Sequence, residues 1–352
     1  MKMFGTYYHD DVEILLKDIT GLVKPLAASE REPLIQSGVH YSEMLPLEYE
    51  PTEAYMAIYR LALERYSKIT ADAVGAVAEQ IWAEKGENAV LVSLARAGTP
   101  VGILIKRYID VRHHVNINHY TISIIRGKGI DKNAVNYILS RHRPEDIQFV
   151  DGWTGKGAIK NVLTEALRDY PQISCDLAVL SDAAYAAEKC GTHEDFLIAS
   201  SCLNSTVSGL LSRTFLRSDI IGENDFHGAA FYSELADRDV TYQFIDRIVQ
   251  DFDLNKDFVI ENDAEPFAGL TEAENIREHF GIRSVNFVKP GIGETTRVLL
   301  RRIPWKILVY SLNDEENLGH IYQLAREKGV EVVEYPLRFY KSCGLIRDLS
   351  DI

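Results

Sequence analysis

The sequence predicts an α/β protein built on a mostly parallel sheet. Continuous apolar runs, such as AVLVSL at 89–94 and IQFV at 147–150, are typical of strands buried on both faces. Amphipathic segments of helical period separate these runs. Strands that alternate with helices favour a parallel sheet with helices on both faces.

The first part of the chain shows this alternation clearly. Expected strands lie at 89–94, 119–125, 147–151, 177–182 (LAVLSD) and 196–200 (FLIAS). Expected helices lie at 51–86, 101–110, 130–142, 158–170 and 240–252, and Thr52 is a suitable N-cap for the first of them.

A second, smaller α/β unit is expected at the C-terminal end. Its elements are the strand 285–291, the helix 294–303, the strand 306–311, the helix 316–329 and the strand 330–336. The acidic tract before it is typical of a linker. We therefore expect one domain over 1–255, with a helical extension at its start, a linker over 256–283 and a second domain over 284–352.

Composition excludes several classes of protein. The net charge of −14 argues against non-specific nucleic-acid binding by the whole chain. From residue 284 onward the balance is near neutral, with 10 Lys and Arg against 9 Asp and Glu. The apolar runs are far shorter than the ~20 residues that span a bilayer, and the start has no signal-peptide pattern, so we expect a cytoplasmic protein and no membrane partner. No CxxC pair occurs among Cys175, Cys190, Cys202 and Cys343, which argues against a zinc site or a disulfide framework.

Two loops that follow strands are suited to anions. The first, SLARAGTPVG, offers a helix start with free backbone N–H groups beside an arginine, which suits a pyrophosphate. Its candidate ligand-binding residues are Ala95, Arg96, Ala97, Gly98 and Thr99.

The second loop, DGWTGKG, follows the strand at 147–150. Its backbone donors, hydroxyl and ammonium surround the volume of one phosphate. The loop is not a Walker A motif, because Gly157 follows Lys156 where Ser or Thr is required, and GxGxxG is absent from the chain. A tight structural turn stays open as the alternative at both loops. The candidate residues here are Asp151, Gly152, Trp153, Thr154, Gly155, Lys156 and Gly157.

These loops resemble the pyrophosphate and phosphoribosyl-diphosphate (PRPP) loops of type I phosphoribosyltransferases, in the same order along the chain. Together with HYSEMLP, HYTISIIRGKGID and SCLNSTVSGLLSRTF, they are similar to a bacterial family associated with tellurite and stress resistance. Its members are described as a phosphoribosyltransferase-like domain joined to a C-terminal Pelota-type RNA-binding domain, and some are labelled cysteine protease StiP. The resemblance therefore implies a type I phosphoribosyltransferase-like sheet and an L7Ae/Pelota-like α/β domain.

The resemblance also implies roles for individual residues. Asp151 would hold ribose hydroxyls and Mg²⁺, and the turn after it would hold the 5-phosphate. The usual motif has two adjacent acids, whereas Asp151 stands alone, so one hydroxyl contact is missing or comes from elsewhere. Arg126 and Lys128, in a loop that would close over pyrophosphate, are further catalytic candidates, and Arg213 is a further ligand-binding candidate.

A cysteine peptidase is the rival hypothesis. Cys202 lies where a helix would start, and His227 is a candidate partner, although their spacing in sequence does not show a contact. A cysteine next to a buried strand is more often part of the core.

The C-terminal unit is expected to meet RNA through a glycine-containing loop and the helix that follows it. The RNA-binding candidates are Gly291, Gly293, Glu294, Thr295, Arg297 and Arg301. A structural or protein-docking module is the alternative.

The resemblance thus implies a PRPP- or nucleotide-binding protein that transfers phosphoribose to an unknown base in a stress-response nucleoside pathway, with Mg²⁺ as cofactor. A non-catalytic, nucleotide-sensing RNA-binding regulator and the cysteine peptidase remain as alternatives. A homodimer stays open.

Overall fold

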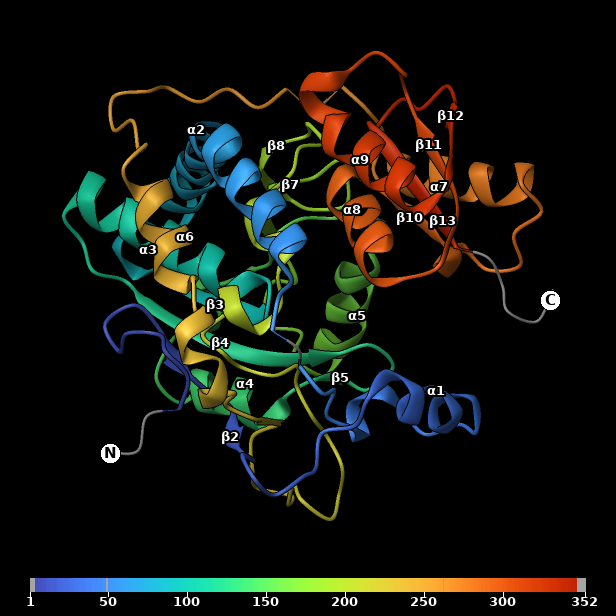
Figure 1. Ribbon diagram of the computed structural model, residues 1–352. Coiled ribbons are helices and arrows are strands. Elements are labelled where there is room, and N and C mark those ends of the chain that lie inside the picture. Colours follow the sequence, from blue (N-terminus) through green and yellow to red (C-terminus); the bar gives the residue numbers. More distant parts are fainter. Residues whose placement is uncertain (1–3, 49, 262, 347–352) are drawn as a thin grey trace.

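A computed structural model describes residues 4–48, 50–261 and 263–346. Its N-terminal part is built on a seven-stranded sheet (Figure 1). The strands are β1 (Glu13–Ile14), β3 (Val90–Ala95), β4 (Asn118–Ile125), β5 (Gly129–Ile130), β6 (Ile147–Val150), β7 (Leu177–Ser181) and β8 (Lys189–Thr192). The helices are α1 (Ala28–Gln36), α2 (Glu53–Lys85), α3 (Gly98–His113), α4 (Lys132–Leu139), α5 (Ala158–Ala166) and α6 (Thr241–Val249). A two-stranded pair, β2 (Lys17–Asp18) with β9 (Gly228–Ala229), completes this part.

The sheet is mostly parallel, as the sequence predicts. Its order is β1-β4-β3-β6-β7-β8, all pairs along this path are parallel, and β5 pairs antiparallel with β4 as the return strand of a hairpin. From β3 the chain moves first to β4 on one side and later to β6 on the other side. The strand order therefore reverses between β3 and β6, and in open α/β sheets ligands bind at such a point, beyond the carboxyl ends of the strands.

Helices cover both faces of the sheet. On one face α2, α3 and α6 pack against buried side chains such as Leu91 and Leu180. On the other face α4 and α5 pack against Val92, Phe149 and Val179. Alternate residues of a strand thus enter opposite cores, which explains why these strands read as continuous apolar runs.

The C-terminal unit has a four-stranded sheet in the order β10-β13-β11-β12. Its strands are β10 (Val288–Pro290), β11 (Pro304–Val309), β12 (Glu331–Glu334) and β13 (Ser342–Ile346), and its helices are α7 (Ala268–His279), α8 (Ile292–Arg301) and α9 (Glu315–Lys328). Helix α7 packs on one face of this sheet, whereas α8 and α9 share the core on the other face. The segment 256–283, expected as a linker, therefore contains a helix that belongs to the C-terminal unit.

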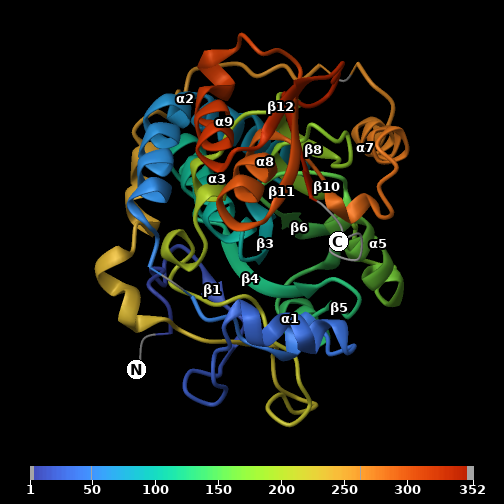
Figure 2. The same ribbon diagram turned by 45° about the vertical axis from the view of Figure 1, so that its right-hand side comes forward.

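The two units share one hydrophobic core. The cluster that contains α2 and α3 continues through Ile292 and Leu299 of α8 and Leu318 of α9. Figure 1 shows α8 on the side of the C-terminal unit that faces the larger sheet, close to α5. In Figures 1 and 2, α1 lies beside the β4–β5 hairpin. The C-terminal unit is thus packed against the rest of the chain and not held by a linker alone.

One expected strand is wrong. Residues 196–200 (FLIAS) form no strand; they run through buried coil into a 3-10 helix at Ala199–Cys202. The outer strand is β8 instead, whose sequence KCGT has little strand preference. A Cβ on Gly191 would lie 2.4 Å from the Ala73 carbonyl oxygen, so glycine lets α2 approach this strand closely.

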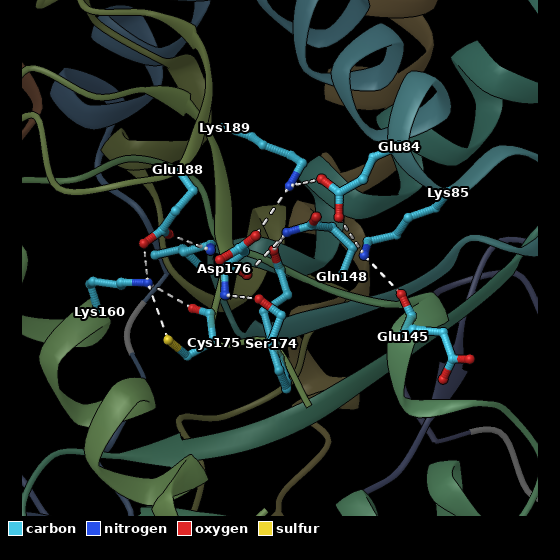
Figure 3. A network of polar contacts seen from close by, with 12 residues as sticks. Glu84, Lys85, Glu145, Gln148, Lys160, Ser174, Cys175, Asp176, Glu188 and Lys189 are labelled. Atoms are coloured by element: carbon cyan, nitrogen blue, oxygen red, sulfur yellow. Dashed lines mark hydrogen bonds and ion pairs between the residues drawn. The ribbon is translucent and has the colours of Figure 1, made fainter. Parts of the chain in front are cut away.

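A polar network ties together the amino ends of β6, β7 and β8 (Figure 3). Lys189 pairs with Glu84 at 2.6 Å and with Asp176 at 3.5 Å, and Lys160 pairs with Glu188 at 2.5 Å. Gln148 donates to the Asp176 carbonyl at 3.0 Å. These contacts fix β6, β7 and β8 to one another and to α2 and α5.

In the part of the chain that the structure describes, no helix combines the length and the apolar character needed to cross a bilayer.

Candidate functional site at the junction of the two units

The loops after β3 and β6 lie in direct contact. A Cβ on Gly98 would stand 2.4 Å from the Val150 carbonyl oxygen, and one on Gly152 would stand 3.6 Å from the Ala97 carbonyl oxygen. Helix α3 begins at Gly98, and Ala97 separates it from the cis Ala95–Arg96 peptide. At position 98 only a residue without a side chain fits, and the two expected anion loops therefore converge.

A cavity of about 230 Å³ opens beside the β6 loop and is lined by both units. The N-terminal part contributes both loops, Arg126 and the start of α5. The C-terminal unit contributes residues of β10 and α8. The lining residues include Ala97, Arg126, Asp151, Trp153, Thr154, Gly155, Lys156, Gly157, Lys289, Glu294 and Arg297.

Asp151 has an unusual environment for a carboxyl group. It is half-buried, and its hydrogen-bond donor among the described residues is the backbone N–H of Gly152, at 2.8 Å. Burial raises the pKa of Asp151 from 3.8 to about 7, against the opposing effect of that N–H. The exposure that remains faces the cavity, so the carboxyl group is available to a ligand and titrates near neutral pH.

Two side chains expected to hold phosphate are already engaged. The Thr154 hydroxyl donates to Asp182, and its N–H donates to the Ser181 carbonyl at 3.0 Å. The Lys156 ammonium donates to the carbonyls of Val285 and Val288 in the C-terminal unit. Burial, aided by the nearby positive charges of Lys289 and Arg126, lowers the pKa of Lys156 to about 8. In this structure, therefore, the Thr154 donors serve the fold, and Lys156 joins the two units.

The backbone of the same loop is free to bind. Among the described residues, nothing accepts a hydrogen bond from the N–H groups of Gly155, Lys156 or Gly157. Gly157 is in the left-handed region at φ +71° and caps α5. Successive free N–H groups that line a cavity at a helix start form an anion-binding concavity.

Two cations of the hairpin between β4 and β5 were expected at the ligand, and one of them lines the cavity. Arg126 lines the cavity, and none of its described contacts is an ion pair with an acid. Lys128 instead lies 3.8 Å from Glu43 and does not line the cavity, so its expected catalytic role finds no support in this arrangement. His40 and Tyr41 contact the Arg126 backbone at 3.0 and 2.9 Å, and they fix the hairpin from the side of α1.

The β3 loop borders a second, adjoining cavity of about 190 Å³. Arg96, Trp153 and Arg297 line it, together with several hydroxyl side chains. The buried Ser201 hydroxyl has no partner within the described structure. Arg96 donates to the Leu211 carbonyl at 3.1 Å, whereas the Thr99 hydroxyl is paired with Thr121 at 2.7 Å inside the fold.

Arg213, expected at the ligand, lies outside both cavities. Its guanidinium stands 5.3 Å from the centre of the Tyr41 ring. Burial, with Arg96 and Arg31 nearby, lowers the pKa of Arg213 to about 10. Arg213 therefore adds to the positive field near Arg96 and has no direct place in the pocket.

Helix α8, expected to face RNA, is turned toward the N-terminal part. The buried carboxylate of Asp195 accepts from the Ile292 N–H at 3.0 Å and from the Lys341 N–H at 2.8 Å. Burial raises the pKa of Asp195 to about 6. This contact holds the first turn of α8 over the cavity.

The RNA-binding candidates are accordingly not an open surface. Gly291 and Thr295 are buried, Gly293 lies against Ser201, and Glu294 and Arg297 line the cavity and pair at 3.0 Å. Arg301 ends the helix, and its side chain lies outside the described residues.

The pairing of Cys202 with His227 does not form. Cys202 is fully buried in the core around α2. His227 instead contacts the Ser123 hydroxyl at 2.8 Å and donates its backbone N–H to Asp131 at 2.5 Å. The two residues therefore belong to different networks.

A different cysteine does lie next to a histidine. The Cys190 Sγ is 3.6 Å from His193 Nε2, and His193 Nδ1 is 2.8 Å from the Asp182 carbonyl and 3.9 Å from its carboxylate. The Tyr185 ring stacks on the imidazole at 3.9 Å. Burial, and secondarily Asp182, raises the pKa of the Cys190 thiol to about 12. In the sequence, the C-x-x-H spacing from Cys190 to His193 is the one signal of this group, and it did not lead to a prediction.

The cavity also offers oxygen ligands of the kind that Mg²⁺ prefers. Asp151 and Glu294 both line it, and a bound phosphate would add further oxygens. The residues present therefore fit a magnesium ion held together with a phosphorylated ligand.

Two descriptions of known protein families match this chain. The family described as "Tellurite-like stress resistance cysteine protease StiP" matches residues 5–249, and the "PELOTA RNA binding domain" matches residues 267–348. A protein of Acinetobacter baylyi named "Cysteine protease StiP" is 35% identical, over 98% of this chain and 94% of its own length.

The solved structures that this chain matches include two phosphoribosyltransferases, and the similarity to both is slight. A xanthine-guanine-hypoxanthine phosphoribosyltransferase of Helicobacter pylori is 17% identical, with a TM-score of 0.24 over 32% of this chain and 70% of its own. A hypoxanthine-guanine phosphoribosyltransferase of Bacillus anthracis is 16% identical, with a TM-score of 0.26 over 36% and 76%. Similarity at this level supports no argument about the ligand.

Proposed function

We propose that this chain, which belongs to the StiP family of tellurite-like stress resistance proteins, binds a phosphorylated ribose in the cavity between its two units, as PRPP or a nucleotide. The observation that carries the proposal is the state of the β6 loop. Gly155, Lys156 and Gly157 line a cavity, and their backbone N–H groups have no acceptor in the described structure. Such donors need an acceptor, and a phosphate supplies several acceptor oxygens.

The charges around the cavity support the same ligand class. Arg126, Lys156, Lys289 and Arg297 line it, against the carboxyl groups of Asp151 and Glu294. Since Asp151 is partly protonated near pH 7, the lining has a surplus of positive charge. A ligand that carries a phosphate would compensate this surplus.

We further propose that the activity is phosphoribosyl transfer. A nitrogen base would displace pyrophosphate from C1 of the ribose, so that a C–N bond forms as the C–O bond breaks. In this scheme the β6 loop holds the 5-phosphate, Asp151 accepts a ribose hydroxyl, and Arg96 and Arg126 attract the leaving pyrophosphate. Mg²⁺, held by Asp151 with the ligand's oxygens, would neutralise charge on the leaving group.

Calorimetric titration with PRPP, with and without Mg²⁺, tests the binding proposal. We expect affinity for PRPP but none for unphosphorylated ribose. Pyrophosphate release with a panel of purine and pyrimidine bases then tests for transfer. Binding without release would support a nucleotide-sensing regulator, and absence of binding under both conditions would refute the proposal.

Arg126 and Lys128 form a matched pair of variants on one hairpin. Arg126→Gln removes a cation that lines the cavity, whereas Lys128→Gln removes one that pairs with Glu43 outside it. We expect about a tenfold loss of PRPP affinity for the first, since a charged hydrogen bond is worth roughly 1.5–3 kcal/mol, and less than a twofold change for the second. Equal effects would contradict the placement of the ligand.

RNA is the proposed partner of the C-terminal unit, because that unit matches an RNA-binding domain. The docked position of α8 restricts how this would occur. Its expected contact residues line the cavity or lie buried, so RNA would have to bind elsewhere on the unit or compete with the N-terminal part for α8.

A cysteine peptidase is the second candidate function, favoured by the name of the 35%-identical relative and by the contact between Cys190 and His193. A cavity of about 300 Å³ lies on the His193 side of this pair. With Nδ1–H donated to the Asp182 carbonyl, Nε2 is free to accept the thiol proton.

The chemistry would follow from this orientation. As Cys190 Sγ attacks a peptide carbonyl carbon, its proton passes to His193 Nε2 and then to the leaving amine. Water then hydrolyses the thioester and restores the thiol. Because burial keeps the thiol neutral at rest, His193 would have to take the proton during the attack.

Cys190→Ser and Cys202→Ser separate this candidate from the peptidase expected from the sequence. Peptide hydrolysis, followed by mass spectrometry of a casein digest, should be lost in the first variant and retained in the second. Loss in Cys202→Ser alone would restore the original assignment. Hydrolysis that survives both substitutions would exclude both cysteines as the nucleophile.

A further inference from the structure

A ribose ring presents two neighbouring hydroxyl groups, and each is a hydrogen-bond donor. An ionised carboxylate is a strong acceptor for such donors, because it offers two oxygens and no hydrogen of its own. The N-terminal part of the cavity contributes a single carboxyl group, that of Asp151. One of the two hydroxyls would therefore remain without a charged acceptor if this part bound the sugar alone.

The C-terminal unit brings a second carboxylate to the same cavity. Glu294 lies in the first turn of α8 and lines the cavity together with Asp151, Trp153 and Lys156. A Cβ on Gly155 would stand 4.0 Å from its Cγ, so Glu294 is adjacent to the free N–H groups of the β6 loop. Its side chain is 26% exposed, and the cavity is the open space that it lines.

One oxygen of Glu294 is already held by a cation. It accepts from the Arg297 guanidinium at 3.0 Å. The other oxygen has no hydrogen bond among the described contacts, and Glu294 lines the cavity. It can therefore accept from a hydroxyl group of a ligand there.

The position of α8 that places Glu294 here is fixed by several independent contacts. Asp195 accepts from the first N–H of the helix, the Tyr340 hydroxyl donates to the Gly155 carbonyl at 2.6 Å, and the Lys156 ammonium donates to the carbonyls of Val285 and Val288. The β6 loop is thus bonded directly to the C-terminal unit, and Asp195 holds the start of α8.

We propose that Glu294 is the second carboxylate of a ribose-diol site whose first carboxylate is Asp151, so that the sugar is held between the two units. This inference rests on the proposed binding of a phosphorylated ribose. It assigns to Glu294 a role in sugar recognition in place of the RNA contact expected from the sequence. It also accounts for the single acid of the β6 loop, because the missing acceptor comes from α8.

The test compares sugars that differ by one hydroxyl. Titration calorimetry measures the affinities for ribose 5-phosphate and its 2-deoxy and 3-deoxy analogues. We expect the wild type to prefer ribose 5-phosphate about tenfold over each analogue, because each loses one charged hydrogen bond. In Glu294→Gln the preference should fall to about twofold for one of the two positions, and in Asp151→Asn for the other. Affinity for inorganic phosphate should be retained or rise in Glu294→Gln, because the substitution removes a negative charge beside the β6 loop.

Glu327→Gln, an exposed substitution on α9, is the control and should retain both preferences. Thermal unfolding of all variants reports whether a substitution has lowered the stability of the protein. An unchanged preference at both positions in a folded Glu294→Gln protein would overturn this inference while leaving the phosphate site intact. Failure of the wild type to bind ribose 5-phosphate, with or without Mg²⁺, would overturn the proposed function itself.

Discussion

At the scale of single residues, the loop after β6 shows how burial creates a site. Asp151 was recognisable from sequence as the acid at a strand end. The pKa of Asp151 could not be predicted from sequence, because its shift depends on which groups surround the carboxyl group in the fold. Conversely, Thr154 and Lys156 had the right chemistry for phosphate, but the fold uses their donors for Asp182 and for the C-terminal unit. The donors that remain available to a phosphate are the backbone N–H groups of the loop, which no sequence pattern marks.

Asp151→Asn should therefore stabilise the protein at alkaline pH. Between about pH 4 and 7 the folded state keeps a proton on Asp151 that the unfolded state has already lost, so the free energy of unfolding falls as pH rises through this window. The asparagine has no such penalty. Since one pKa unit corresponds to about 1.4 kcal/mol and cavity water reduces the effect, we expect a gain on the order of 2 kcal/mol at pH 8.

At pH 5 the same gain should shrink to less than half, because pH 5 is only about one unit above the unfolded pKa, so keeping the proton on the folded carboxyl group costs about a third of its full value. Urea unfolding at both pH values measures the difference. A variant that is less stable than wild type at pH 8 would show that the carboxylate is stabilised by a partner, in contradiction to its environment here.

At the scale of elements, strands and helices with strong periodicity were predictable, and their neighbours were not. The strands β3, β4, β6 and β7 follow from apolar runs. Residues 196–200 had an equally apolar run but form no strand, whereas the short β8 forms because Gly191 admits α2. Helix α8 was predictable too, but the partner of its first turn, Asp195, lies almost a hundred residues earlier.

Removal of the Asp195 carboxylate should weaken the packing of α8 against the N-terminal part. In Asp195→Ala the N–H groups of Ile292 and Lys341 remain buried without an acceptor, and each such group costs about 1–3 kcal/mol. We expect the free energy of unfolding to fall by about 3 kcal/mol and the affinity for ribose 5-phosphate to fall with it, because α8 lines the cavity.

The neighbouring Glu194→Ala is the matched control for this variant. Glu194 is exposed and pairs with the Lys341 ammonium at 2.6 Å, and surface ion pairs contribute at most about 1 kcal/mol. Chemical unfolding monitored by circular dichroism distinguishes the two. Similar losses in both variants would mean that α8 is held by the apolar contacts and not by the cap.

At the scale of the whole molecule, the division into an N-terminal sheet domain and a smaller C-terminal unit was visible in the sequence. How the units meet was not. The pattern of α8 showed an apolar stripe but could not show that its residues enter the same core as α2 and α3. An RNA-facing helix and a docked helix have the same amphipathic pattern, and the difference appears only when the other unit is placed beside it.

Because the units share one core, we expect them to unfold together. Two single-tryptophan variants report on each side: one retains Trp82, which stacks on His113 in the N-terminal part, and the other retains Trp305, which packs against Phe280 in the C-terminal unit. The remaining tryptophans are replaced by phenylalanine. The denaturant midpoints of the two variants should agree, each after correction for its own change in total stability measured by circular dichroism. An earlier transition at Trp305 would mean that the C-terminal unit unfolds independently of the N-terminal part, in contradiction to a shared core.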